Sequence, residues 1–247
     1  MLKILILILL TISLQAETIR IAMAANVSYA TQELIKTFNT QHPNTKVLTT
    51  LGGTGKLVAQ IRHAAPYHLL MAADMRYPKA LYRDGLAINE PKIYAHGALV
   101  LMSRTEQDFS KGLKLLLDSS IRKIAIANPK IAPYGMASFE ALEKSALLED
   151  IKPKLVYGES IAQTVAHTMV AADIGFIAKS SLFAPALRHL KEHIHYKEVD
   201  LTLYTPIEQG IVILKNGEHN RAVKEFYDFI FSDEAAKIFS KYGYSLP

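Results

Sequence analysis

Residues 51–61 read Leu51-Gly-Gly-Thr-Gly-Lys-Leu-Val-Ala-Gln-Ile61, a turn of small residues that leads into an amphipathic helix. Leu57, Val58 and Ile61 recur at the spacing of one helical face. The glycines lack a Cβ, so the backbone of the turn can approach a ligand closely. The first N–H groups of a helix have no internal partners and form the positive end of its dipole. With the hydroxyl of Thr54 beside them, these groups form a candidate anion site; the alternative is that Thr54 is an ordinary N-cap residue.

Residues 1–16 have the features of an export signal. Lys3 comes first, an apolar run follows, and Ser13-Leu-Gln-Ala16 closes the run with the small residues that signal peptidase prefers. The run is shorter than the roughly 20 residues that a membrane-spanning helix needs. We expect a signal peptide over 1–16, cleavage before Glu17 and a periplasmic mature protein.

The composition restricts the kinds of partner and cofactor. The 247 residues are 50% hydrophobic and 21% charged, values typical of one or two globular domains. The formal net charge of +5 comes in no run typical of nucleic-acid binding, although it favours encounters with anions. The chain has no cysteine, so disulfides, thiolate metal sites and a lipid-anchored cysteine are excluded. We expect a monomer that binds no nucleic acid and carries no cofactor.

Strand and helix patterns alternate regularly along the chain. The first series has strands at 18–24, 46–51 and 68–72, with helices at 28–41, from 54 onward and at 75–83. The second series has strands at 123–127, 154–157 and 173–177, with helices at 138–148 and 161–171. Apolar strands at 98–102 and 210–214 flank the second series, and helices at 221–231 and 234–242 close the chain. This pattern predicts an α/β fold of two lobes, each a mostly parallel sheet flanked by helices.

Two crossing strands near 98–102 and 210–214 are the expected hinge between these lobes. The first lobe is predicted to comprise 17–97 plus 211–247, and the second 98–210. In open α/β sheets, ligands bind beyond the carboxyl ends of the strands. Four loops occupy such positions, two in each lobe: 24–28, 52–55, 128–135 and 158–161. A binding site in the cleft between the lobes follows from this distribution.

The order and spacing of three motifs resemble the periplasmic molybdate-binding proteins of ABC importers. The motifs are Ala24-Ala-Asn-Val-Ser-Tyr-Ala30, Gly53-Thr-Gly-Lys-Leu-Val-Ala-Gln-Ile61 and Ala73-Asp74. The closing helices at 222–230 and 235–243 are also similar to those of that family, and the similarity covers most of 18–244. The resemblance implies a periplasmic-binding-protein architecture that captures molybdate or tungstate and delivers it to a membrane permease, without catalysis.

The resemblance also implies the donors to the oxyanion. The family's two loop serines fall at Asn26 and Thr54, and backbone amide donors fall near Tyr134 and at Ile161. Asn26 is expected to donate through its side-chain amide. The family often has a tyrosine hydroxyl donor at the position of Ala178, which is a departure, and Tyr134 is the candidate replacement. Molybdate, tungstate and sulfate are not ranked by the sequence.

Other site hypotheses find less support in the residues. A phosphate-binding P-loop is rejected, because Thr50 stands at its first glycine and Leu57 at its magnesium ligand. His189, His193 and His195 have a spacing that could bind zinc, but a surface cluster is the favoured interpretation.

An enzyme would need a nucleophile with its base, or a pair of acids. The chain contains no G-x-S-x-G motif, and Asp74 is interpreted as a helix cap. An adhesin or another small-anion binder of the same fold, or an extracytoplasmic hydrolase, remain the alternatives.

Overall fold

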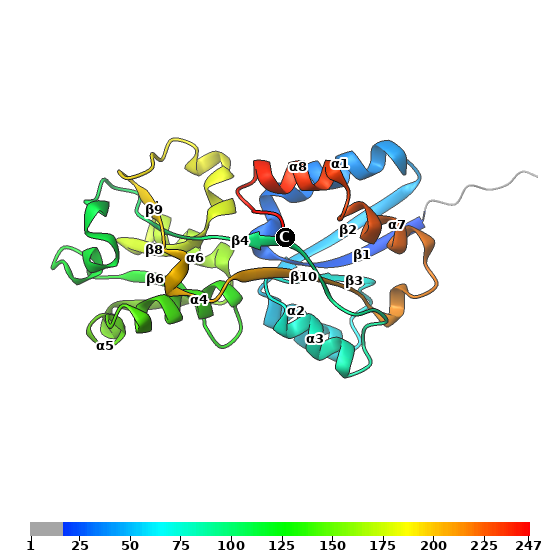
Figure 1. Ribbon diagram of the computed structural model, residues 1–247, viewed down its shortest axis with the longest axis horizontal. Coiled ribbons are helices and arrows are strands. Elements are labelled where there is room, and N and C mark those ends of the chain that lie inside the picture. Colours follow the sequence, from blue (N-terminus) through cyan, green and yellow to red (C-terminus); the bar gives the residue numbers. More distant parts are fainter. Residues whose placement is uncertain (1–16) are drawn as a thin grey trace, which may run out of the picture.

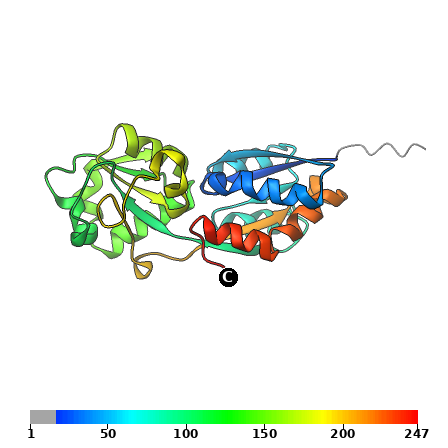
Figure 2. The ribbon, with the colours of Figure 1, turned by 90° about the horizontal axis from the view of Figure 1, so that it is seen from above.

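The computed structural model describes residues 17–247, so the expected signal peptide lies outside the described residues. Two lobes lie side by side along the long axis of the molecule (Figures 1 and 2). Each lobe has one five-stranded sheet with helices on both faces. The predicted two-lobed α/β architecture is confirmed.

The sheet of the first lobe has the strand order β2-β1-β3-β10-β4. Its strands are β1 (Glu17–Ala24), β2 (Thr45–Gly52), β3 (Leu69–Met71), β4 (Lys92–Gly97) and β10 (Ile207–Ile213). Its helices are α1 (Ser28–Gln41), α2 (Thr54–Arg62), α3 (Arg76–Arg83), α7 (Arg221–Phe229) and α8 (Asp233–Lys241). Strands β1, β2 and β3 run parallel, whereas β10 runs antiparallel to its neighbours β3 and β4.

Side chains of β1 point alternately to the two faces of the sheet, and each face has its own part of the core of this lobe. Ile19, Ile21 and Met23 pack with α1, α7 and α8, while Ala22 packs with α2 and its surroundings. Successive side chains of a strand point to opposite faces, so one strand serves both layers. Figure 1 shows α1, α7 and α8 on one side of this sheet and α2 and α3 on the other.

The sheet of the second lobe has the strand order β7-β6-β8-β5-β9. Its strands are β5 (Leu99–Met102), β6 (Ile124–Ala127), β7 (Leu155–Gly158), β8 (Ile174–Ala178) and β9 (Tyr196–Glu198). Its α-helices are α4 (Pro133–Lys144), α5 (Leu148–Ile151) and α6 (Ile161–Val170). Short 3-10 segments complete the chain: η1 (Ala25–Val27), η2 (Phe109–Leu117), η3 (Lys152–Lys154), η4 (Lys179–Phe183), η5 (Pro185–Leu187), η6 (Leu201–Leu203) and η7 (Lys215–Gly217).

Helix α4 begins earlier than its apolar pattern predicts. The expected start was residue 138, but the helix starts at Pro133. Proline fits the first helical position, because its φ is preset and its missing N–H would have had no partner there. The earlier start brings Tyr134 into the first turn of the helix.

The chain crosses between the lobes at two places, of which the first lies at the expected hinge near 98–102 and the second does not lie at 210–214. The first crossing is at Ala98, between β4 and β5, and the second lies at 204–206, between η6 and β10. The expected hinge strand at 210–214 instead belongs largely to β10, inside the first sheet. Near the second crossing, the pairing of β10 with β4 shifts register between Gln209 and Gly210.

The segment after α8 returns to the hinge. Ser245 pairs with His96 of β4 through two backbone hydrogen bonds of 2.8 and 3.1 Å. The end of the chain therefore lies beside β4 (Figure 2). Strands β4 and β10 are called the crossing strands, because β4 leads into the first crossing and β10 follows the second. Within 17–247, no helix combines the length and the apolar character needed to span a membrane.

Candidate functional site

The four predicted loops meet at one small cavity between the lobes. The residues that line it are Ala24, Ala25, Asn26, Gly52, Gly53, Thr54, Ala73, Ala132, Pro133, Tyr134 and Ile161. All four predicted site residues are among them, two from each lobe. None of these lining residues carries a carboxylate or a cationic side chain.

Three helix N-termini point their first turns at this cavity. Thr54 is the first residue of α2, Tyr134 the second of α4 and Ile161 the first of α6. A backbone N–H at such a position has no acceptor within its own helix. Within 17–247, none of the three N–H groups donates to a side chain or to another loop. The cavity therefore lies at the positive ends of three helix dipoles.

The hydroxyl of Thr54 adds a donor of a different kind. Gly53, with φ −62° and ψ 137°, is the N-cap of α2, so the alternative that Thr54 is the cap is wrong. Thr54 is 1% exposed, and its Oγ1 accepts a hydrogen bond from the N–H of Ala73 at 3.2 Å. Because the oxygen is held as an acceptor, its own hydrogen is free to point into the cavity.

The side chain of Asn26 has a different role from the one predicted. Its Nδ2 donates to Oε1 of Gln209 at 2.7 Å and to Oη of Tyr244 at 2.8 Å. Both amide hydrogens are thus engaged within the protein, and the donor that remains for a ligand is the backbone N–H of Asn26 in η1. Gln209 and Tyr244 lie 183 and 218 residues away, so no local pattern could have indicated them.

The phenol of Tyr134 reaches the hinge. The side chain is 2% exposed, and a Cβ at Gly97 of β4 would overlap its hydroxyl. Burial raises the pKa of Tyr134 well above the ordinary value, so the phenol stays protonated. The hydroxyl therefore lies against a crossing strand, whereas the sequence predicted a replacement donor. Ala178, fully buried at the end of β8, does not line the cavity.

The lobes touch each other at the rim of the cavity. A Cβ added to Gly53 would lie 2.6 Å from the carbonyl oxygen of Glu159 in the second lobe. Beside this contact, Nζ of Lys56 lies 3.5 Å from Oε2 of Glu159, and both side chains are largely exposed. The structure therefore has the cleft closed at these loops.

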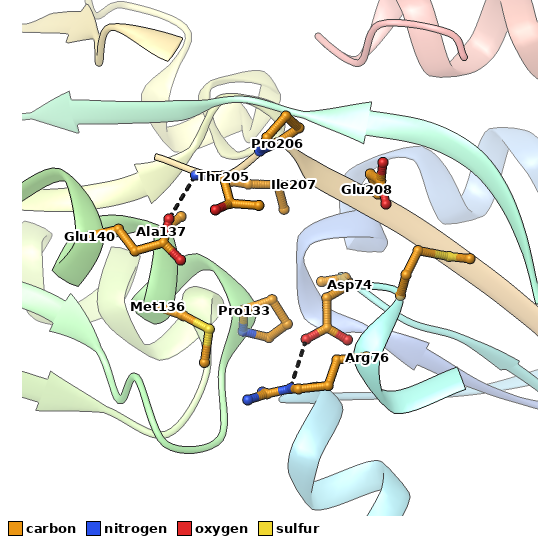
Figure 3. A pocket seen from close by; sticks show the side chains of 12 residues that line it. Asp74, Arg76, Pro133, Met136, Ala137, Glu140, Thr205, Pro206, Ile207 and Glu208 are labelled. Atoms are coloured by element: carbon orange, nitrogen blue, oxygen red, sulfur yellow. Dashed lines mark hydrogen bonds and ion pairs between the residues drawn. The ribbon is translucent and has the colours of Figure 1, made fainter. Parts of the chain in front are cut away.

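A second cavity of about 220 Å³ adjoins the first and shares Ala73 and Pro133 with it (Figure 3). Its wall includes the carboxylates of Asp74, Glu140 and Glu208. These negative charges disfavour an anion, so the smaller cavity is the better anion site.

Two of the three carboxylates of the larger cavity, those of Asp74 and Glu140, already have structural partners. Oδ1 of Asp74 accepts from the N–H of Tyr77 in the first turn of α3 at 3.2 Å, but the N-cap residue of that helix is Met75, so the interpretation of Asp74 as the cap is wrong by one position. Its Oδ2 lies 3.6 Å from Nε of Arg76, and Oε2 of Glu140 accepts from the N–H of Thr205 at 2.7 Å (Figure 3). Burial raises the pKa of Asp74 above its usual value.

The histidine hypothesis finds no metal site in the part of the chain that the structure describes. Over 17–247, no three side chains of His, Asp or Glu are grouped to hold a metal ion. Nδ1 of His195 accepts a hydrogen bond from the N–H of Lys191 at 3.2 Å, so this ring is tied to its own loop.

Comparisons with known proteins show the family of the chain. The family model described as "Bacterial extracellular solute-binding protein" matches residues 19–245. The molybdate-binding protein ModA of Azotobacter vinelandii is 35% identical over 254 residues, covering 96% of this chain and 94% of that protein. ModA of Rhodobacter capsulatus is 35% identical over 226 residues, covering 90% and 86%.

A solved structure supports the same assignment. The periplasmic molybdate-binding protein of Azotobacter vinelandii superposes with a TM-score of 0.85 at 30% identity, covering 93% of this chain and 99% of that one. The match of the family model from the first strand to the C-terminal segment, together with these relatives, shows that the chain belongs to the bacterial extracellular solute-binding proteins.

Proposed function

We propose that this protein captures a tetrahedral oxyanion, molybdate or tungstate, between its lobes in the periplasm and delivers it to the permease of an ABC importer. The observation that carries the proposal is the convergence of three helix N-termini on a cavity without a charged side chain. The names of the relatives from Azotobacter and Rhodobacter supply the choice of ion.

The proposed donors are the N–H groups of Asn26, Thr54, Tyr134 and Ile161 and the hydroxyl of Thr54. Fixed amide dipoles and a hydroxyl can stabilise a dianion without a countercharge, because each hydrogen bond to a charged acceptor is strong. A fully deprotonated oxyanion offers only acceptors, so a shell of donors selects it against a protonated phosphate.

The protein acts by binding, without turnover and without a cofactor. Donors come from both lobes, so the shell is complete only when the lobes meet. The ion therefore favours the closed form by the difference in its affinity for the two forms. Exchange between open and closed forms through the crossings at Ala98 and 204–206 would let the ion enter and leave.

Thermal unfolding with and without molybdate, tungstate, sulfate and phosphate tests the proposal. Ligand at about 1,000 times its dissociation constant adds roughly 4 kcal/mol to stability. For a chain of this size, that raises the melting temperature by about 8–16 °C. We expect this shift for molybdate and tungstate and a smaller one for sulfate, whose shorter bonds underfill the shell. Equal shifts with sulfate would remove the ion assignment, and no response to any oxyanion would overturn the proposal.

Export is tested separately. Residues 1–16 would serve as the cleaved signal, so mass spectrometry of the protein from its native cells should find Glu17 at the N-terminus. A mature protein that still begins with Met1 would contradict the periplasmic assignment.

A further inference from the structure

Asn26 is held more tightly than its place in a short loop requires. Its side chain is 1% exposed, and four hydrogen bonds surround the residue. Nδ2 makes the two bonds to Gln209 and Tyr244, while the backbone carbonyl accepts from Oγ of Ser180 and from Oη of Tyr244, both at 2.8 Å. These partners come from β10, from η4 and from the segment after α8.

Tyr244 closes a ring on Asn26. Its hydroxyl accepts from Nδ2 of Asn26 and donates to the carbonyl of the same residue. One phenol thus fixes the side chain and the backbone of Asn26 relative to each other. Burial raises the pKa of Tyr244, so the hydroxyl keeps the hydrogen that it donates. The next residue, Ser245, pairs with His96 of the crossing strand β4.

Gln209 ties the same loop to the other crossing strand. It is fully buried in β10, at the register shift beside Gly210, and such irregularities re-aim side chains. Its Nε2 donates to the carbonyl of Ile207 at 3.0 Å. This bond orients the amide, so Oε1 is the atom that accepts from Asn26.

Gln209 also lies beside the second donor loop of the first lobe. Its Nε2 is 3.5 Å from the carbonyl oxygen of Ala73, and the N–H of Ala73 donates to Oγ1 of Thr54. A single buried amide in the hinge strand therefore contacts Asn26 directly and Thr54 through one residue. Neither Gln209 nor Tyr244 lines the anion cavity.

We propose that Tyr244 and Gln209 are positioning residues, which aim the N–H of Asn26 at the bound oxyanion and couple that aim to the two crossing strands. The proposal rests on the proposed function of the cavity. The hydrogen-bond strength of an N–H to a charged acceptor falls steeply with misalignment, so a loosened Asn26 loses affinity although its own N–H remains.

The test compares Tyr244→Phe with Tyr94→Phe in the full mature chain. Tyr94 is 3% exposed in the same core, and within 17–247 its hydroxyl has no hydrogen-bond partner. Each variant removes one buried hydroxyl, but only Tyr244→Phe releases Asn26. Calorimetry with molybdate should show affinity about 10- to 30-fold weaker for Tyr244→Phe, the equivalent of two ordinary hydrogen bonds. The affinity of Tyr94→Phe should stay within about 2-fold of the wild type.

An amide NMR signal separates positioning from general damage. Binding of an anion should shift the N–H signals of Asn26 and Ile161 in the wild-type protein. In Tyr244→Phe saturated with molybdate, the shift at Asn26 should shrink while that at Ile161, in the other lobe, is retained. Gln209→Met, which keeps the length of the side chain and removes its polar atoms, should weaken affinity in the same direction and serves if Tyr244→Phe does not fold.

The outcomes are distinguishable. A wild-type protein that binds no oxyanion overturns the proposed function and this proposal with it. A wild-type protein that binds molybdate, with Tyr244→Phe no weaker than Tyr94→Phe, overturns the positioning role alone. Equal loss of the molybdate-induced shifts at the N–H groups of Asn26 and Ile161 in Tyr244→Phe would also overturn the positioning role alone.

Discussion

The backbone N–H of Gly55, in the first turn of α2, donates across the cleft to the carbonyl oxygen of Ile131 in the second lobe at 3.0 Å. An N–H at this position has no acceptor in its own helix, so the opposite lobe supplies one. The closed form therefore has a hydrogen bond of its own in addition to those proposed for the ion. Such a bond contributes about 1 kcal/mol, which is too little to hold the lobes together alone but enough to favour closure.

Gly53→Ala should weaken ligand binding by acting on the closed form. The backbone of Gly53 has ordinary angles, so alanine adds no strain by itself. The new Cβ would lie 2.6 Å from the carbonyl oxygen of Glu159, in the opposite lobe. A clash of this kind costs about 1–3 kcal/mol, or roughly 5- to 150-fold in affinity.

The neighbouring Gly52→Ala is the control for that variant. Its Cβ would meet only the side chain of Leu57 at 3.4 Å, an ordinary contact. We expect Gly52→Ala, which adds a methyl group but no contact with the opposite lobe, to lose much less affinity than Gly53→Ala. X-ray scattering with saturating molybdate should give Gly53→Ala a larger radius of gyration than Gly52→Ala. Equal radii and affinities would show that the lobes do not close at this contact.

Thr54→Ala should lower affinity by removing a donor to a charged acceptor. Such a bond contributes about 1.5–3 kcal/mol, so titration should show a loss of roughly 10- to 150-fold. Thr54→Ser keeps the hydroxyl and should stay within a few-fold of the wild type. If Thr54→Ala lowers only the melting temperature of the unliganded protein and Thr54→Ser does not, the hydroxyl is structural.

Ala178→Tyr should destabilise the protein and not restore a donor. Ala178 is fully buried opposite Leu99 of β5, where there is no room for a phenol. Overpacking costs about 1–3 kcal/mol, so the melting temperature of the unliganded protein should fall by roughly 2–12 °C. Ala178→Ser, which is close in size to the wild-type alanine, is the control, and its melting temperature should fall less. Tighter molybdate binding by Ala178→Tyr would contradict this expectation.

Asp74→Asn should change how stability depends on pH. Burial raises the pKa of Asp74, so its ionised form is less favourable in the folded than in the unfolded protein. This penalty is fully present above the folded pKa and disappears as the pH falls to the unfolded value of about 3.9. Urea unfolding without ligand should therefore show the wild type gaining stability relative to Asp74→Asn as the pH falls from 7 towards 4.

Asp173→Asn is the control of opposite sign. Burial works against ionisation here, but the N–H groups of Arg122 and Lys123 donate to Oδ2 at 2.8 Å, and the pKa of Asp173 is lowered. Its contribution is present above the unfolded value of about 3.9 and is lost below it. The wild type should therefore lose stability relative to Asp173→Asn as the pH falls below 4. If the stability of the wild type relative to each variant changed in the same direction as the pH falls, the opposite pKa shifts of Asp74 and Asp173 would be refuted.

Much of the fold follows from local patterns. The helix at 28–41 and the start of the next helix at Thr54 match the structure, because a 3.6-residue period and a glycine turn are visible in neighbouring residues. The loops of the site are also local features, placed at the ends of strands. Strand β4 was not predicted, since Lys92–Gly97 mixes polar and apolar residues without a clear period.

The detailed roles of the site residues depend on distant parts of the chain. The side chain of Asn26 turns away from the proposed ligand only because Gln209 and Tyr244 are brought beside it by the fold. The phenol of Tyr134 lies at the hinge because Gly97 leaves space for it. Neither contact has a signature within a window of neighbouring residues, so the sequence predicted the positions and not the orientations.

The lining of the small cavity has a consequence for the energetics of uptake. Its only titratable side chain is that of Tyr134, whose pKa is raised well above 10. Between pH 5 and 9, loading of a fully deprotonated ion would then take up and release no protons at the site. The measured heat of binding should be the same in buffers of different ionisation enthalpy. The lining of the cavity would itself give capture no dependence on the acidity of the medium outside the cell.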